Sequence, residues 1–210
     1  MSLAFLSPSP TALCRSPMER QALAAGARLE ERDGWNVAVR FDGDEAERER
    51  LRASVGFADL SHLGKIEVQG TQAAGLELGT ATLEDCVWWL PYSRARAIAL
   101  CPPADLPALR ERLDDPVDVT TVFAALAMAG PLARELFARF TALDLRDSMT
   151  PVHAFRPGSV ARTPGAVIRQ SEDRWLMLFG AALGQYMWTV VADAAQSLGG
   201  GPVGVDSLDA

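Results

Sequence analysis

Histidine, cysteine and lysine are scarce in this sequence. Its 210 residues include two histidines, three cysteines and a single lysine, Lys65. Cys14, Cys86 and Cys101 are odd in number and too far apart for a paired-ligand metal motif or a redox dithiol. We therefore expect no metal site, and we expect a reducing compartment such as the cytoplasm.

Long apolar segments and clusters of positive charge are also missing. No stretch approaches the ~20 apolar residues that a membrane-spanning helix needs, and the apolar start at 1–6 lacks the features of a signal peptide. The formal net charge is −7 and the arginines are scattered, whereas nucleic-acid binding needs a basic surface. We expect a cytoplasmic protein, mature as translated, that contacts neither membrane nor nucleic acid.

The two histidines restrict hydrolytic chemistry. A serine hydrolase triad would have to use His62 or His153. Ser61 and His62 are sequence neighbours, and neighbouring side chains diverge in extended backbone, so this pair indicates a structural turn. The glycine-rich stretch 199–204 follows a predicted helix, whereas a phosphate-binding loop precedes one. These patterns predict no catalytic residue.

The start of the sequence carries a helix signal. Ser16, Pro17 and Glu19 match a capping box with proline at the first helical position. In such a box the glutamate reaches back to the backbone of the serine. The pattern predicts a helix that runs to about Gly26.

Two further helices have clear signals. One is predicted from Asp44, where acidic residues including Glu47 stand at the positive end of the helix dipole and arginines follow. We expect this charge run to be a solvated face. An apolar stripe over 183–198 predicts the last helix, and Gly199 stands where a left-handed cap would end it.

Alternating and continuous apolar runs predict the strands. The segment 65–69 alternates polar and apolar side chains, as a strand half exposed to water does. Strands mixed with helices, without regular strand-helix-strand crossovers, favour an α+β fold. We place a loose N-terminal lead-in at 1–15, a first lobe at 16–116 and a second lobe at 117–210, the two lobes forming one domain. The other predicted strand segments are 86–90, 95–101, 117–129, 160–169 and 174–179.

Large aromatic side chains gather in two places. Trp88 and Trp89 are adjacent, and Trp175, Tyr186 and Trp188 lie in the last third of the chain. Their apolar surfaces with polar edges suit either a core or an interface with another chain, and both interpretations stay open for each of them.

Four segments carry a familiar pattern: 16–28, 34–41, 55–70 and 118–131. In the third, the turn from Asp59 to His62 leads into a predicted strand, and Leu63 follows the histidine. Together they resemble the glycine cleavage T-protein, a tetrahydrofolate-dependent aminomethyltransferase. The resemblance implies a folate-binding domain made of two small lobes of antiparallel sheet with flanking helices. Matched by position, Leu63 takes the place of a residue that touches the folate, and Asp59 and Arg162 are the other candidate contacts.

The departures from this pattern concern the acidic groups. The family's hairpin with Gly-Gly and an acidic pair has no counterpart, because the chain runs from 94–96 to 101–103 and directly into a predicted helix. The family signature Arg-Thr-Gly-Tyr-Thr-Gly-Glu begins at Arg162 and Thr163 but continues without the glutamate, and Glu172 is displaced from that position. We also expect the family's C-terminal barrel to be absent.

This loss resembles the gamma subunit of heterotetrameric sarcosine oxidase. The resemblance implies a non-catalytic subunit that binds no cofactor alone and packs against larger flavoprotein oxidase subunits, which hold the flavin and NAD. The alternative is a tetrahydrofolate-dependent aminomethyltransferase or folate-binding module of one-carbon metabolism. A structural relative with an unrelated partner is a third possibility. The supporting segments are 143–145, 155–158, 162–163, 175–178 and 186–188.

Overall fold

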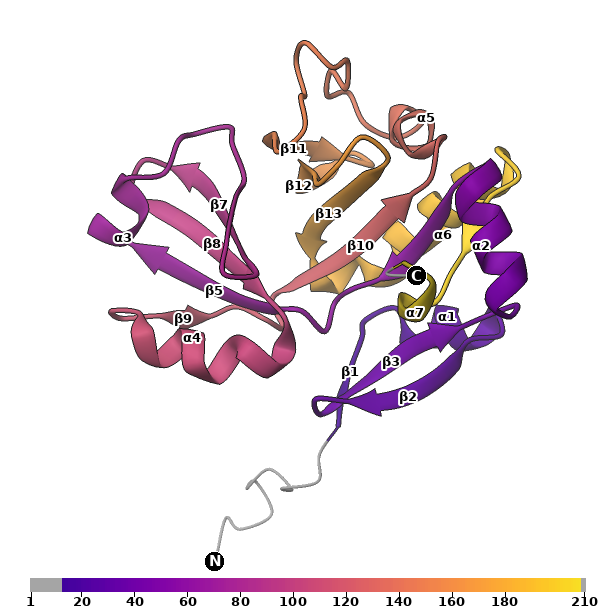
Figure 1. Cartoon of the computed structure of the whole chain (residues 1–210), viewed down its shortest axis with the longest axis horizontal. Helices are drawn as coiled ribbons and strands as arrows, with labels where there is room; N and C mark the ends of the chain where they lie inside the picture. Colours follow the sequence, from indigo (N-terminus) through magenta and orange to yellow (C-terminus); the bar gives the residue numbers. More distant parts are fainter. Residues whose placement is uncertain (1–12, 209–210) are drawn as a thin grey trace, which may run out of the picture.

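The computed structural model describes residues 13–208. The predicted lead-in at 1–15 lies outside this range except for its last residues, of which Cys14–Arg15 form a short strand, β1. Three sheets make up the described chain, with helices packed against them (Figure 1). The largest sheet lies between a layer of helices and the two smaller sheets.

The central sheet has six strands and sends side chains to two cores. Its strands are β4 (Gly56–Asp59), β10 (Phe123–Ala129), β11 (Phe155–Val160), β12 (Thr163–Arg169), β13 (Arg174–Gly180) and β14 (Gly201–Pro202). They lie in the order β11-β12-β13-β10-β4-β14, and only the pair β14 and β4 is parallel. In β10, Leu126 and Met128 face the helices while Ala125 and Ala127 face the smaller sheets, as the two-residue period of a strand requires.

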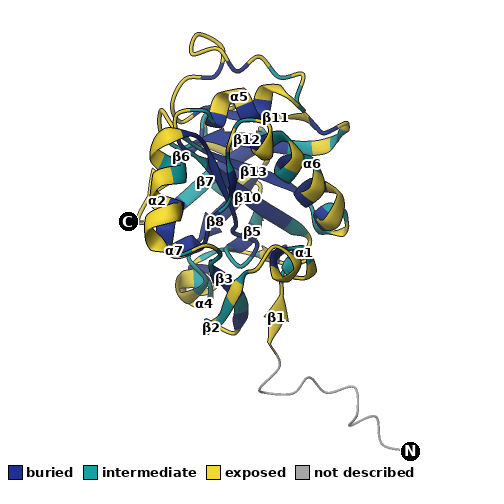
Figure 2. Ribbon diagram, turned by 90° about the vertical axis from the view of Figure 1, so that its right-hand side faces the viewer, coloured by how far each residue is buried: buried dark blue, intermediate teal, exposed yellow. Residues whose placement is uncertain are grey.

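Helices cover one face of the central sheet. They are α1 (Glu19–Ala24), α5 (Ala133–Ala138) and α6 (Gly184–Gln196), which confirms the predicted last helix. Between them and the sheet, Trp188 meets Phe57 edge to face with ring centroids 5.1 Å apart, and Phe137 meets Trp175 at 5.7 Å. Trp175 and Trp188 are therefore core residues, and Figure 2 shows this buried interior beneath the exposed outer faces of the helices.

A five-stranded antiparallel sheet lies beside the central one (Figure 1). Its strands are β5 (Gly64–Gln69), β6 (Thr82–Glu84), β7 (Val87–Ser93), β8 (Arg96–Cys101) and β9 (Val117–Asp118), in the order β6-β7-β8-β5-β9. Helices α3 (Thr71–Ala74) and α4 (Leu106–Arg112) pack on its outer face. As the sequence predicts, β8 continues through one short 3-10 turn, Pro103–Asp105, directly into α4.

The third sheet is small and holds the N-terminal part of the described chain. Strands β2 (Arg28–Arg32) and β3 (Trp35–Arg40) form an antiparallel hairpin, and β1 adds to β3 in parallel. Helix α2 (Asp44–Ala53) and the short helix α7 (Val205–Leu208) lie near it. Apolar side chains of β3 join those of β7 and β8 in the core that lies on the face of the central sheet opposite the helices. The two smaller sheets therefore cover the same face of the central sheet.

The predicted fold class is confirmed. Mixed helices and mainly antiparallel strands form an α+β fold, and the strands of residues 13–208 make three open sheets and no closed barrel. β4, from the predicted first lobe, lies in the central sheet, and β9, from the predicted second lobe, pairs with β5. The division into lobes at 16–116 and 117–210 stays a prediction.

Two predicted strands are divided by turns. The segment 117–129 forms β9 and β10, because the chain turns between them where the amides of Val122 and Phe123 donate to the carbonyl of Val119. The predicted strand at 160–169 begins too early, because Val160 ends β11 and β12 begins at Thr163. Ala161 and Arg162 have positive φ angles of 46° and 62° and make the turn between β11 and β12.

The predicted capping box is wrong. Helix α1 begins at Glu19, directly after Met18, so Ser16 and Pro17 precede the helix and do not cap it. The Ser16 hydroxyl accepts a hydrogen bond from the Met18 amide at 3.0 Å. The Glu19 carboxylate instead accepts one from the side-chain amide of Asn36 at 3.2 Å. Strand β3 brings Asn36 to the start of α1, so a tertiary contact replaces the local one.

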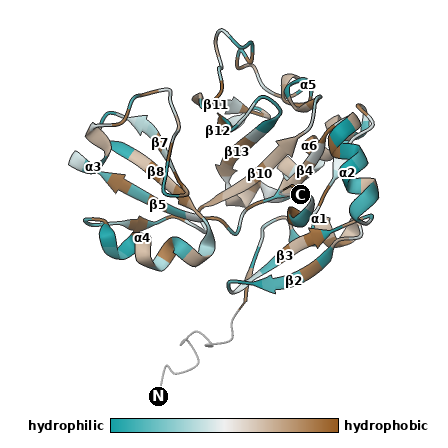
Figure 3. Cartoon of the chain, in the orientation of Figure 1, coloured by the Kyte–Doolittle hydropathy of each residue, from teal (hydrophilic) through white to brown (hydrophobic). Residues whose placement is uncertain are grey.

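The prediction of a solvated face on α2 is wrong for one residue. Figure 3 shows hydrophilic residues along this helix, yet Glu47 is fully buried. Its carboxylate accepts hydrogen bonds from the amides of Phe41 and Gly204 at 2.6 and 2.7 Å, from the amide of Asp42 at 3.2 Å and from the Ser207 hydroxyl at 2.7 Å. Through these hydrogen bonds Glu47 links the C-terminal segment to the β3–α2 loop.

Candidate functional site

The loop between β4 and β5, residues 60–63, lies where all three sheets meet. Asp59, at the end of β4, accepts a hydrogen bond from the Ser61 amide at 2.9 Å and another from the Ser16 hydroxyl. Burial raises the pKa of Asp59 above its ordinary value of 3.8, against the effect of these hydrogen bonds and of Lys65. The Asp59 carboxylate is thus engaged inside the protein.

Lys65 is buried, although the alternation at 65–69 predicts an exposed side chain. Its ammonium donates to the carbonyls of Leu63 and Ser61 at 2.8 and 3.0 Å, and more weakly to that of Thr120 at 3.4 Å. Burial lowers the pKa of Lys65 to about 8, although Asp59 and Asp118 oppose this shift. Carbonyls of the loop at 60–63 and of Thr120 thus take the place of water around the ammonium, which the sequence pattern does not show.

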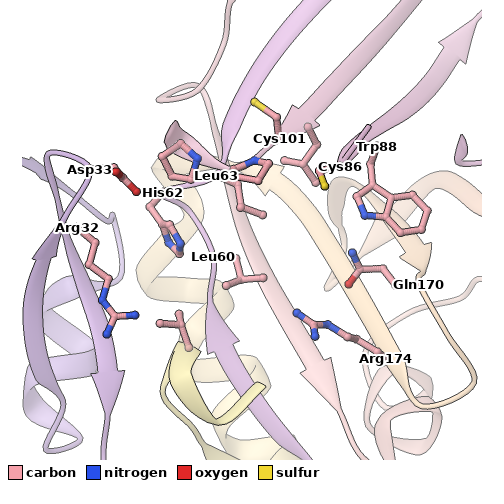
Figure 4. Close-up of a pocket in the computed structure, with 14 residues that line it drawn as sticks. Arg32, Asp33, Leu60, His62, Leu63, Cys86, Trp88, Cys101, Gln170 and Arg174 are labelled. Carbon is pink, nitrogen blue, oxygen red and sulfur yellow. The ribbon is translucent and has the colours of Figure 1, made fainter. Parts of the chain in front are cut away.

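A cavity of about 300 Å³ opens beside this loop (Figure 4). His62 and Leu63 enter it from the loop, Arg32 comes from the end of β2, and Trp88 comes from β7. Gln170 and Arg174 line it from the central sheet, so all three sheets contribute. The remaining lining residues are Asp33, Leu60, Cys86, Leu100, Cys101, Pro102, Pro103 and Val205.

Three titratable groups of this cavity, His62, Cys101 and Arg32, are neutral at pH 7 or paired. Burial lowers the pKa of His62 to about 4, with Lys65 and Arg32 adding to the effect. Burial also raises the pKa of the Cys101 thiol to about 11. Arg32 forms an ion pair with Asp206 at 2.5 Å. A neutral imidazole and a protonated thiol fit a binding surface better than a nucleophile with its base.

A second, larger cavity of about 520 Å³ lies between the two larger sheets. Glu67 of β5 stands at its edge and accepts hydrogen bonds from the Tyr92 hydroxyl, the Arg96 guanidinium and Gln69. Burial favours a raised pKa for Glu67, but these hydrogen bonds outweigh it and the pKa is lowered. The other walls are apolar: Ile98, Phe123, Phe155, Pro157, Pro164, Gly165, Ala166, Leu178, Phe179, Gly180 and Leu183.

Sequence reasoning missed Glu67 as a cavity residue. The residues Glu67, Tyr92 and Arg96 come from three strands, and only the pairing of β5 with β8 and of β8 with β7 brings them together. The period of 65–69 does show that Glu67 and Lys65 share a face of the strand. It does not show which face meets another sheet.

The three predicted folate contacts are not gathered around one cavity. Leu63 lines the smaller cavity, and Asp59 is buried with its carboxylate bound by Ser16 and Ser61. Arg162 is exposed in the β11–β12 turn and lines neither cavity. Their role as folate contacts stays a prediction.

Residues 13–208 contain neither a metal-ligand cluster nor a membrane-spanning helix. In this range, no three histidine, cysteine or acidic side chains stand close enough together to hold a metal ion. None of the helices described in it is long and apolar enough to cross a membrane.

Known proteins with similar sequences are aminomethyltransferases. The enzyme of Streptomyces coelicolor is 28% identical over 234 aligned residues, which cover 96% of this chain and 62% of the relative. That of Saccharopolyspora erythraea is 24% identical over 93% of this chain and 62% of the relative. The chain resembles the glycine cleavage T-protein superfamily. No protein-family model matches it, and it spans 62% of the length of these two relatives.

Solved structures show the same fold. The glycine cleavage aminomethyltransferase T of Bartonella henselae superposes with a TM-score of 0.75 and 18% identity, covering 94% of this chain and 61% of that one. A chain of heterotetrameric sarcosine oxidase from Corynebacterium sp. U-96 superposes with a TM-score of 0.66 and 17% identity. That match covers 88% of this chain and 96% of the oxidase chain. The T-protein-like fold is thus common to all three.

Proposed function

We propose that this chain is a non-catalytic, cytoplasmic subunit of a heteromeric oxidase that acts on sarcosine or a related N-methyl amine. The observation that carries the proposal is the extent of the structural matches. The fold accounts for 96% of one chain of the sarcosine oxidase heterotetramer, but for only 61% of the Bartonella aminomethyltransferase. A protein of this size and fold therefore has a counterpart inside an oxidase assembly.

The chemistry of Asp59 and of the adjoining loop at 60–63 supports a non-catalytic role. Asp59, the acidic residue of the T-protein-like motif, is buried and bound by Ser16 and Ser61. The pKa of His62, at about 4, leaves its imidazole uncharged at pH 7. The Asp59 carboxylate is thus engaged by hydrogen bonds inside the protein, and His62 lines the smaller cavity without a charge. In this proposal the flavin and NAD belong to larger partner subunits, and this chain alone binds no cofactor.

Co-expression with flavin-containing amine oxidase subunits from the same genome tests the proposal. A tag on this chain should retain a complex that shows flavin absorbance and oxidises an N-methyl amine. The isolated chain should show neither aminomethyl transfer nor oxidation. Recovery of the chain without flavoprotein, under conditions in which the larger subunits are soluble, would contradict the proposal.

A folate-binding module is the second candidate, and Glu67 is the observation that favours it. This carboxylate lies at the edge of an apolar cavity, where one oxygen accepts from Tyr92 and has room for a further donor. Calorimetric titration with tetrahydrofolate separates the two candidates. A dissociation constant near 1 μM, about −8 kcal/mol, that is lost in Glu67→Ala would establish the folate-binding module instead.

A further inference from the structure

Exposed apolar side chains are concentrated in two segments of this protein. Nine large hydrophobic residues of the described chain are exposed, and four of them, Leu78, Leu83, Met149 and Val152, lie at 78–83 and 149–152. We call these four residues the apolar patch. Single exposed hydrophobic residues are common, whereas a contiguous group marks an interaction surface.

Backbone hydrogen bonds hold the two segments together. The Ala81 amide donates to the carbonyl of His153 at 2.7 Å, and the Phe155 amide donates to that of Gly79 at 2.9 Å. The Arg156 guanidinium donates to the carbonyls of Gly79 and Met149, both at 2.6 Å. These contacts fix the patch before any partner binds, which reduces the entropy lost on association.

Aromatic contacts and a strand edge complete this surface. Trp88 lies opposite Leu83 in the β6–β7 pair and meets the ring of His153 edge to face at 5.4 Å. β6 is the edge strand of its sheet, so its outer backbone groups have no strand partner in the described chain. An exposed edge that carries apolar side chains favours association with another chain.

Three acidic residues stand beside the apolar patch at 77–85, and the Arg156 guanidinium lies at Met149. Glu77, Glu84 and Asp85 are exposed, and none of them forms an ion pair with a residue of the described chain. We call these three residues the acidic rim. A twofold contact between two copies would bring the same net negative surface together twice, with three carboxylates and the Arg156 guanidinium on each side. Like charges opposed in this way disfavour a second copy as the occupant.

We propose that the apolar patch and acidic rim dock a larger flavin-containing subunit through an apolar surface with lysine or arginine at its border. The inference rests on the proposed function and names the part of the chain that carries the assembly. Apolar contact supplies the affinity, and the opposite charges of the two rims supply orientation and a salt-dependent association rate.

Co-expression with flavin-containing amine oxidase subunits from the same genome tests the docking surface. Leu83→Asp and Met149→Asp place charge in the patch and should each reduce flavoprotein recovery about tenfold or more. Val122→Asp is the matched control, because Val122 is 53% exposed against 50% and 51% for the two patch residues and lies outside both patch segments. Thermal unfolding of each purified variant checks that the fold is intact. The triple variant Glu77→Gln, Glu84→Gln, Asp85→Asn should weaken the complex and reduce its salt dependence.

Three outcomes distinguish this inference from the proposed function. Failure of the unaltered chain to retain flavoprotein refutes both. Retention by the unaltered chain and equally by the patch variants and the Val122 control leaves the proposed function standing and overturns the docking surface. A dimer of the isolated chain that Leu83→Asp converts to monomers would identify a second copy as the occupant and also overturn the proposal.

Discussion

Replacing Glu47 should destabilise the fold more than replacing any exposed acidic residue of α2. Its carboxylate is fully buried and accepts four hydrogen bonds, two from the β3–α2 loop and two from the C-terminal segment. A buried donor that loses its acceptor costs about 1–3 kcal/mol, and water entering the truncated site recovers part of this. We expect Glu47→Ala to lower the free energy of unfolding by about 4 kcal/mol.

Urea denaturation measures this loss directly. With a slope of about 2 kcal/mol per molar urea, the unfolding midpoint should fall by about 2 M. Glu47→Gln should lie between the two proteins, because it keeps one acceptor oxygen but turns an amide group toward two of the donors. Glu45→Ala is the control on the same helix, where an 84% exposed side chain and a 3.9 Å ion pair with Arg52 predict a change below about 0.5 kcal/mol.

The result that refutes this reasoning is a small difference between the two alanine variants. If Glu47→Ala unfolds within about 1 kcal/mol of Glu45→Ala, the four hydrogen bonds do not hold the C-terminal segment. A normal midpoint with a changed slope would instead indicate a change in the surface exposed on unfolding.

Three further predictions concern buried groups. Folding lowers the pKa of His62 from 6.5 to about 4, so the unfolded state binds the proton more tightly than the folded state does. The free energy of unfolding should therefore rise by about 3 kcal/mol as pH increases from 4 to 6.5. An NMR titration midpoint near 6.5 for His62 would contradict this. Folding lowers the pKa of Lys65 from 10.5 to about 8, so above pH 8 the unfolded state again binds the proton more tightly and the free energy of unfolding should rise with pH. Urea denaturation at several pH values should show this rise in the unaltered chain and not in Lys65→Met. A Cβ on Gly204 would lie 1.8 Å from the Val39 carbonyl oxygen, so Gly204→Ala should unfold at a temperature several degrees lower in a thermal scan. Gly75→Ala is the control: nothing lies within 4 Å of a Cβ there, and its unfolding temperature should change little.

Local signals predicted α1, α2, α4 and α6. They also predicted the strands β5, β7, β8, β10, β12 and β13. The apolar stripe at 183–198 and the acidic start at Asp44 correspond to α6 and α2, because a helix depends on residues three or four positions apart and on its ends. The split of 117–129 into β9 and β10 was not predicted, since apolar residues continue through the turn and only pairing with β5 and β13 defines each strand. The T-protein-like fold itself was predicted from resemblance at 55–70 and is confirmed.

The three candidate site residues have different surroundings in the structure. Leu63 lines a cavity beside the loop at 60–63, but the carboxylate of Asp59 faces Ser16 and Ser61, and Arg162 lies in a distant turn. A motif identifies which residues stand near one another along the chain. It does not identify which side chains a neighbouring sheet will cover.

The sequence by itself determined the fold class, the main helices and the loop that joins β4 to β5. Tertiary structure alone decided that Glu47 and Lys65 are buried, that Glu67 meets Tyr92 and Arg96 at a cavity, and that an apolar patch joins 78–83 to 149–152. The reason is physical: periodicity and capping act over a few residues, whereas burial and charge pairing depend on segments that only the folded chain brings together.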